Sequence, residues 1–258
     1  SDTPLCAESP LGGLSYFAVF DGHGGARAAE FCGERLCGLL AAELSNEPAD
    51  ALKRALAKLE EEWLAVARAE ELMDGTTAAV ALLDRAAGRC VVANIGDSEV
   101  LLGTREEAGS RSFRALTEVH HVKRSASEAQ RVSAAGGRVW RGRLGHPKIS
   151  PQVLSLAVSR AIGDLFFKDE RYTEGRTSGL IAEPHITAIE VCGQGIAEQF
   201  LLIGCDGLWD TVSYEHAAEV VFDRLGAGEA PQTISEALVR LARDAGSSDN
   251  ITVMVVVM

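Results

Sequence analysis

The chain has 258 residues, of which 47% are hydrophobic and 24% charged. This is the composition of an ordinary globular domain, and it excludes a disordered, collagen-like or disulfide-scaffold protein. The 37 acidic and 25 basic residues give a formal net charge of −12, which argues against a nucleic-acid or anionic-membrane binder because such proteins carry a positive surface.

The cysteines and the apolar stretches indicate where the protein works. None of the six cysteines shows CxxC spacing, so we expect reduced thiols and an intracellular protein, cytoplasmic and/or nuclear. The apolar stretches fall short of the ~18 residues that span a bilayer, and no signal peptide is visible. The chain starts at Ser1 rather than Met, which is typical of a fragment or a processed chain. We expect one domain over residues 1–258, acting as a monomer.

The first half of the chain begins with helical periodicity and continues with short apolar runs bounded by Gly, Asp or Arg. We expect helices over 26–44 and 52–66, and strands over 78–83, 90–95 and 100–103. A run of charged residues in the second helix is interpreted as its solvated face. This run consists of Lys53, Arg54, Lys58 and Glu60 to Glu62.

The second half mixes both periods. A helix is expected over 127–135, a loop over 138–152 and a long polar surface excursion over 168–180. The last third alternates again, and we expect strands over 186–191, 200–205 and 251–258 and helices over 214–225 and 231–245. The order lacks the regular alternation of a doubly wound parallel sheet and predicts a layered α+β domain.

Three acidic residues follow apolar strands and precede turns. They are Asp21, Asp206 and Asp249. Each alone could be an ordinary turn residue, since Asp-Gly is a common turn dipeptide. Two Asp-Gly pairs after similar apolar strands, with His23 next to the first, favour a site instead. Carboxylates that converge there would repel each other unless a cation neutralised them, and hard oxygen ligands suit Mg²⁺ or Mn²⁺. A histidine beside such a centre is a candidate general acid.

Eight blocks in order carry a family resemblance: FAVFDGHGG (17–25), DGTTAAVALL (74–83), VVANIGDSEVLL (91–102), EAQRVSAAGGRV (128–139), LAVSRAIGDLFFK (156–168), IAEPHI (181–186), CDGLWDTVS (205–213) and SDNITVMVV (248–256). In these blocks the chain resembles the metal-dependent protein phosphatases of the PPM family, the type 2C serine/threonine phosphatases. The resemblance implies a four-layer α-β-β-α sandwich, with two central antiparallel sheets flanked by helices.

The resemblance also implies a site with two Mg²⁺ or Mn²⁺ ions per subunit. Asp21 would bridge both metals, the Gly22 carbonyl would bind one, and Asp206 and Asp249 would bind the other. A water activated by both ions would hydrolyse phosphoserine or phosphothreonine in phosphoprotein substrates. His23 would protonate the leaving oxygen.

Supporting roles follow from the same resemblance. Asp164 would lie near the metal-bound waters and Asn250 would support the site. Arg160 is either a structural ion-pair partner or a residue on the phosphate side. Residues 168–180 would form the variable flap beside the cleft. Cys205, next to Asp206, is interpreted as a packed strand thiol.

The chain departs from the family pattern in three places. Family members carry an Arg…Glu-Asp motif that would lie just before Ser1, so we expect this chain to lack the N-terminal strand and the motif. Val119 stands where some members have an acid that holds a third metal, and Glu99 replaces a common Arg.

These departures leave alternatives to catalysis. A pseudophosphatase that binds partners on the same fold is the main one, and a dimetal nuclease is disfavoured by the acidic composition. Asp21, Gly22, His23, Asp206 and Asp249 favour an active phosphatase.

Overall fold

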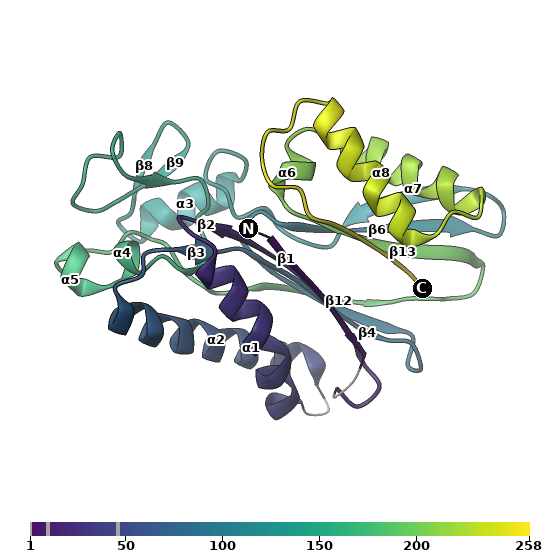
Figure 1. Ribbon diagram of the computed structural model, residues 1–258, viewed down its shortest axis with the longest axis horizontal. Helices are drawn as coiled ribbons and strands as arrows, with labels where there is room; N and C mark the ends of the chain where they lie inside the picture. The colour runs from purple at the N-terminus through teal and green to yellow at the C-terminus, as the bar shows by residue number, and fades with distance from the viewer. Residues whose placement is uncertain (1, 9–10, 45–46) are drawn as a thin grey trace.

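The computed structural model describes residues 2–8, 11–44 and 47–258, and of Asp2–Glu8 it describes the backbone only. Two antiparallel sheets stack face to face, and helices cover the outer face of each (Figure 1). The expected four-layer α-β-β-α sandwich is confirmed. Within the described chain, no helix combines the length and the apolar character needed to cross a membrane.

The larger sheet has the strand order β11-β3-β2-β4-β5-β12, with β1 paired antiparallel to β2. Its strands are β1 (Asp2–Glu8), β2 (Ser15–His23), β3 (Gly75–Thr76), β4 (Ala78–Asp84), β5 (Arg89–Ile95), β11 (Ile162–Gly163) and β12 (His185–Glu190). A strand therefore does precede β2. The expectation that the chain lacks the Arg…Glu-Asp motif stays a prediction.

The smaller sheet has the order β14-β13-β6-β7. Its strands are β6 (Glu99–Glu106), β7 (Arg111–Ala115), β13 (Ile196–Gly204) and β14 (Val253–Val257). The run at 251–258 was expected to be an apolar strand buried on both faces or in a sandwich core. It forms the edge strand β14, in which Met254 and Val256 pack in the core between the sheets and Val253, Val255 and Val257 pack in the cluster on the other face.

The alternation of side chains along β4 explains the layers. Successive side chains of a strand point to opposite faces, so a continuous apolar run serves two cores. Ala78, Val80 and Leu82 pack in the cluster under the helices. Ala79, Ala81 and Leu83 pack in the cluster between the sheets. The same alternation in β2 divides Tyr16, Ala18 and Phe20 from Phe17 and Val19.

Two helix pairs close the sandwich. Helices α1 (Arg27–Glu43) and α2 (Pro48–Glu70) cover the larger sheet, and α7 (Tyr214–Gly226) and α8 (Pro231–Asp244) cover the smaller one (Figure 1). Their periodicity was predicted because apolar residues recur on one face. In α2 the buried Leu52, Leu56, Leu59 and Trp63 form that face.

A third, three-stranded sheet belongs to a small unit beside the sandwich, which we call the side subdomain (residues 126–158). It contains α3 (Ala126–Ala134), β8 (Arg138–Trp140), β9 (Arg143–Gly145) and β10 (Ser155–Leu156). The chain then returns through β11 of the larger sheet to the short helices α4 (Leu165–Lys168) and α5 (Glu170–Thr173). The expectation that 138–152 is a loop is wrong for β8 and β9, because these strands are too short to show a period. They pair across a tight turn at residues 141–142.

Residues 168–180 are less of a surface excursion than expected. They begin with the end of α4 and continue through α5, and Thr173, Ser178 and Leu180 are buried. Asp169 anchors the segment by accepting a hydrogen bond from Arg68 of α2 at 2.8 Å. Short helices and buried polar anchors leave no periodic signature in a sequence, so the segment resembles a loop.

Candidate active site

A cavity of about 630 Å³ opens at one end of the sandwich. Its lining brings together carboxylates from distant parts of the chain. These are Asp21, Asp97, Asp164, Asp206 and Asp249. Gly22 and His23 line the same cavity, so all the residues proposed as catalytic or as metal ligands lie on one surface.

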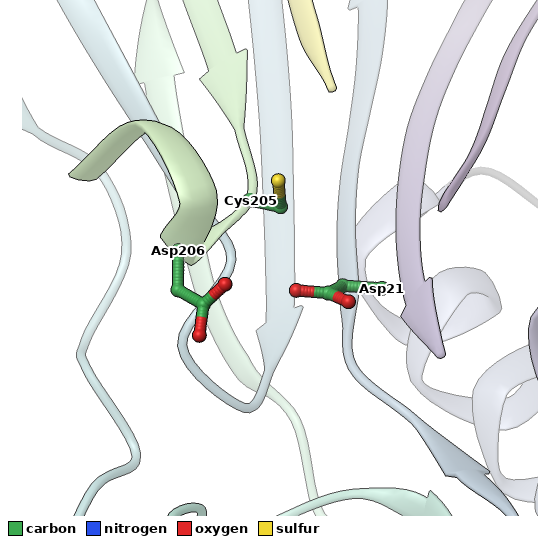
Figure 2. A group of neighbouring side chains, drawn as sticks. All are labelled: Asp21, Cys205 and Asp206. Carbon is green, nitrogen blue, oxygen red and sulfur yellow. The ribbon is translucent and has the colours of Figure 1, made fainter. Parts of the chain in front are cut away.

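Asp21 and Asp206 form the centre of the site. Asp21 lies near the end of β2 in the larger sheet, and Asp206 begins α6 (Asp206–Trp209) directly after β13 of the smaller sheet. One ligand atom each of Asp21, Asp206 and Cys205 lies within 4.8 Å of the other two. In Figure 2 the two carboxylates approach each other while the sulfur of Cys205 points away from the gap between them.

Cys205 is a structural residue rather than a ligand. Its side chain is buried, its Sγ accepts a hydrogen bond from the Thr252 amide at 3.2 Å, and its thiol donates to the Asn250 carbonyl at 3.4 Å. Hard divalent cations prefer oxygen ligands. The donor set that remains, two facing carboxylates, fits Mg²⁺ or Mn²⁺.

Asp97 adds a further carboxylate that the sequence analysis gave no role. Burial, together with the nearby charge of Asp206, raises the pKa of Asp97 to about 7. Burial alone raises a carboxyl pKa, and the charge of Asp206 adds a repulsion that a cation would relieve. Asp97 lies in the motif Gly96-Asp97-Ser98, which follows the apolar strand β5. An acidic residue after an apolar strand is the same pattern that pointed to Asp21.

His23 is paired with Asp164. The ring Nε2 lies 2.8 Å from Asp164 Oδ2, although the two residues are far apart in sequence. Burial lowers the pKa of His23, but the charge and the hydrogen bond of Asp164 outweigh it, so the net effect raises this pKa above its usual value. The structure thus places Asp164, which was expected near metal-bound waters, against the ring of the candidate general acid.

A segment between α2 and β3 holds this pair in place. Asp74 Oδ2 accepts the amide of Ala28 at 2.7 Å, at the start of α1, and the Asp74 carbonyl accepts the amide of Asp164 at 3.2 Å. At Gly75, a Cβ would collide with Asp164 Oδ2 and lie 2.8 Å from His23 Nε2. Only glycine leaves room for the pair to meet.

Glu60 fastens the turn that carries Asp164. Its carboxylate accepts the Gly163 amide at 2.7 Å and the Lys168 ammonium at 2.6 Å, and Lys168 also donates to the Ala161 carbonyl at 2.7 Å. Asp164 itself has a φ of 56°, in the left-handed region that non-glycine residues rarely adopt. The interpretation of Glu60 as part of a solvated face is therefore wrong, because its partners come from a turn about a hundred residues away.

The loop that carries Asp249 is tied to the start of α6. Ser247 Oγ donates to the Gly207 carbonyl at 2.7 Å, and a Cβ at Gly207 would collide with the Asn250 carbonyl. Asp249 is exposed and lines the cavity. Asn250 takes part through its backbone, since its amide donates to Asp249 Oδ1 at 2.8 Å.

Arg160 lies outside the cavity lining. It is held by Glu128 of α3 at 2.8 Å and donates to the Glu183 carbonyl at 2.9 Å, so its geometry is that of a structural ion pair. Arg143, which the sequence analysis placed in a loop, lines the cavity instead. Its Nε and Nη2 donate to Ser155 Oγ and to the Ser155 carbonyl, both at 2.9 Å.

Glu99 and Val119, the two positions at which this chain departs from the family pattern, have different surroundings. Glu99 is buried, and it accepts hydrogen bonds from the Tyr214 hydroxyl and from Arg124 Nη2. Arg124 also bridges to Asp210 Oδ1 at 3.3 Å. The negative charge that replaces the family's common Arg is thus compensated within the fold. Val119 is half-buried and does not line the cavity.

Residues 168–180 were expected to form the variable flap beside the cleft. None of residues 169–180, all of which are described, lines the cavity. The part of the chain before this segment contributes residues to the lining instead, which are Arg143, Leu154, Leu156, Ala157, Val158, Phe166 and Phe167.

Comparisons with known proteins agree with the fold. The family model for protein phosphatase 2C matches residues 3–251. Protein phosphatase 1F of Mus musculus is 38% identical over 253 residues, covering 94% of this chain and 49% of the relative. Protein phosphatase 1E of Homo sapiens is 36% identical over 246 residues, covering 94% of this chain and 29% of the relative. The chain thus spans about half or less of the length of these relatives.

A solved serine-threonine phosphatase 2C from Toxoplasma gondii shares the fold, with a TM-score of 0.73 at 22% identity over 95% of this chain and 84% of that one. The family match covers nearly the whole chain, and the family is metal-dependent. The chain belongs to the protein phosphatase 2C family.

Proposed function

We propose that the chain is the catalytic domain of a Mg²⁺- or Mn²⁺-dependent phosphatase that hydrolyses phosphoserine and phosphothreonine in proteins. One observation carries the proposal: the facing carboxylates of Asp21 and Asp206 share a cavity with the His23–Asp164 pair. A cation site and a general acid are the two groups that hydrolysis of a phosphate monoester needs. The named phosphatases among the relatives support the same reaction.

Asp21, Asp206, Asp249 and the carbonyl of Gly22 would hold two divalent ions. When bound, such ions supply positive charge that polarises a phosphate ester and makes water a stronger nucleophile at neutral pH. The buried thiol of Cys205 points away from the gap between the two carboxylates (Figure 2) and does not line the cavity, so it is not positioned as a nucleophile.

The chain's own residues would supply the proton and the orientation. The protonated Nε2 of His23 donates to Asp164, which leaves the Nδ1 proton for the leaving oxygen of serine or threonine. Because Asp164 stabilises the imidazolium, the pKa of His23 is raised, and the acid form persists to a higher pH than in a free histidine. Arg143, the only arginine or lysine lining the cavity among the described residues, would contact the phosphate.

A monomeric, intracellular protein is part of the proposal. The five cysteines whose side chains are described, Cys32, Cys37, Cys90, Cys192 and Cys205, are all free, as expected where thiols stay reduced. Light scattering coupled to size-exclusion chromatography tests the monomer.

The test of the activity is hydrolysis of a phosphopeptide by the full-length protein. Turnover should require Mn²⁺ or Mg²⁺ and stop on addition of EDTA. Asp206→Asn should lower kcat/KM by more than the roughly 10–100-fold typical of a lost outer partner of a metal ligand. Asp244→Asn, the same exchange at an exposed position of α8, is the matched control. Turnover without metal, or full activity in Asp206→Asn, would reject the proposal.

A further inference from the structure

The cavity lining contains two chemically different sets of side chains. Besides the carboxylates it contains an apolar set, which we call the apolar wall, formed by Met73, Leu154, Leu156, Val158, Phe166 and Phe167. None of these side chains offers an oxygen ligand to Mg²⁺ or Mn²⁺ or a hydrogen bond to a phosphate. The proposed chemistry therefore leaves this part of the cavity without a role.

The apolar wall exposes surface that a folded protein normally hides. Among the described residues, the large hydrophobic side chains that are clearly exposed are Met73, Phe113, Val139 and Val153. Met73, which is 38% exposed, lines the cavity, and so do the half-buried Leu154, Leu156 and Phe166. Exposed apolar side chains gathered in a concave surface indicate a ligand-binding site.

The wall is preformed rather than adaptable. Leu154, Leu156 and Phe166 pack against the buried core of the side subdomain. Phe166 stacks on His146 with ring centroids 4.9 Å apart, and His146 Nε2 donates to the Phe166 carbonyl at 2.9 Å. A rigid wall loses little conformational entropy when it binds a ligand.

The volume of the cavity, and the fact that the apolar wall and the carboxylates share it, identify the kind of ligand. A cavity of about 630 Å³ is far larger than a phosphate group and lies within the ~300–1,000 Å³ range of ligand sites. The wall shares this one cavity with Asp21, Asp206 and His23. A substrate whose phosphate reaches the carboxylates therefore brings its neighbouring residues against the wall.

We propose that this wall is a specificity subsite that receives an apolar side chain next to the phosphoserine or phosphothreonine of the substrate. The inference rests on the proposed function, because it takes the carboxylate side as the phosphate site. Leu154 and Leu156 form the part of the subsite in and beside β10, and Met73 and Phe166 flank it. A leucine side chain desolvated there gains free energy that serine or lysine does not.

Binding of phosphopeptide analogues tests the subsite independently of turnover. Peptides that carry a non-hydrolysable phosphonate in place of phosphoserine are compared by fluorescence anisotropy on the full-length protein with Mn²⁺. They have leucine, serine or lysine directly before or after the phosphonate. The leucine peptide should bind about tenfold more tightly than the serine peptide in at least one of these positions. Equal affinities, or tighter binding of the lysine peptide, would overturn the proposal.

Two neighbouring variants sharpen the test. Leu156→Asn keeps the approximate size of the side chain but makes it polar, so the leucine-to-serine affinity ratio should fall towards one. Val153→Asn is the matched control because Val153 does not line the cavity, and the ratio should stay near that of the native protein. Thermal unfolding checks that both variants are folded. An unchanged ratio in folded Leu156→Asn contradicts the subsite.

The proposed function is judged separately by Mn²⁺-dependent hydrolysis of p-nitrophenyl phosphate, which has no neighbouring residues. Hydrolysis without a leucine preference supports the phosphatase and overturns the subsite. A leucine preference without hydrolysis supports the subsite and rejects the catalytic proposal.

Discussion

The two walls of the cavity are built in different ways. The central carboxylates, Asp21 and Asp206, stand at the ends of long strands, one in each sheet, whose registers are fixed by pairing over many residues. The apolar wall stands on a three-stranded sheet with strands of two or three residues, supported by its own small core. The long strands fix where chemistry takes place, while a short local unit can change what is recognised without disturbing the sandwich.

Removing the anchor of the side subdomain should produce the largest effect on stability. Glu128 accepts hydrogen bonds from Arg131, Arg160 and Ser159, which hold its pKa well below the usual range despite burial. Glu128→Gln should cost about 3 kcal/mol of unfolding free energy at pH 7, because it leaves two arginines without their carboxylate. Urea denaturation measures this cost.

The pH dependence of the stability loss in Glu128→Gln tests whether the lost charge is its cause. A depressed carboxyl pKa stabilises the protein above the unfolded-state value, and this contribution is lost as the pH falls towards the folded-state value. The difference in stability between the native protein and Glu128→Gln should therefore shrink steadily below about pH 4.5. A difference that does not change with pH would assign the loss to packing rather than charge.

A side chain at position 75 should separate His23 from Asp164 and leave the apolar wall unchanged. In Gly75→Ala the new methyl group must displace Asp164 from His23. We expect kcat to fall by about 100-fold, within the range of a lost general acid, while phosphopeptide binding changes little. Gly38→Ala, at an exposed site of α1 where nothing lies within 4 Å, is the control and should keep full activity. Native kcat in Gly75→Ala would refute the role of the pair.

Arg143 lines the same cavity as the carboxylates and the apolar wall, and its replacement should separate binding from chemistry. Arg143→Gln removes the positive charge offered to the phosphate, and KM should rise about tenfold with a smaller change in kcat. Steady-state kinetics with a phosphopeptide measure the two constants. Arg141→Gln changes an exposed arginine of the same hairpin that stacks on Trp140, and it should leave KM unchanged. A loss confined to kcat would place Arg143 in the chemistry instead.

The smallest effect is expected for replacing Glu60, which holds the turn that carries Asp164. Glu60→Gln weakens the contacts to Gly163 and Lys168, and kcat should fall about three- to tenfold, corresponding to the 0.5–1.5 kcal/mol of one hydrogen bond. Glu61→Gln is an ideal comparison because Glu61 is the next residue of α2 and is exposed. Equal activities of the two variants would show that the turn holds Asp164 without Glu60.

The sandwich could be predicted from the sequence because its strands and helices are long enough to show their periods. Asp21 and Asp206 could be predicted as well, because each follows an apolar strand within a motif. Asp249 was expected to follow a strand too, but it follows helix α8 and precedes the apolar strand β14. Glu60 and the pairing of His23 with Asp164 could not, since their partners lie far along the chain and only the fold brings them together. Arg143 and the apolar wall were missed because strands of two or three residues carry no period.

The division of β2 between two cores has a consequence for how the protein opens. Its side chains are buried in the helix-covered core on one face and in the inter-sheet core on the other. Asp21 and His23 extend from this strand, so no local fluctuation can release them while the sandwich stands. Amide hydrogens within β2 should therefore exchange with solvent only through global unfolding, whereas those of β8 to β10 exchange through smaller openings. Heat inactivation should then coincide with loss of the whole fold. The preference for one substrate over another should be lost at a lower temperature than catalytic activity.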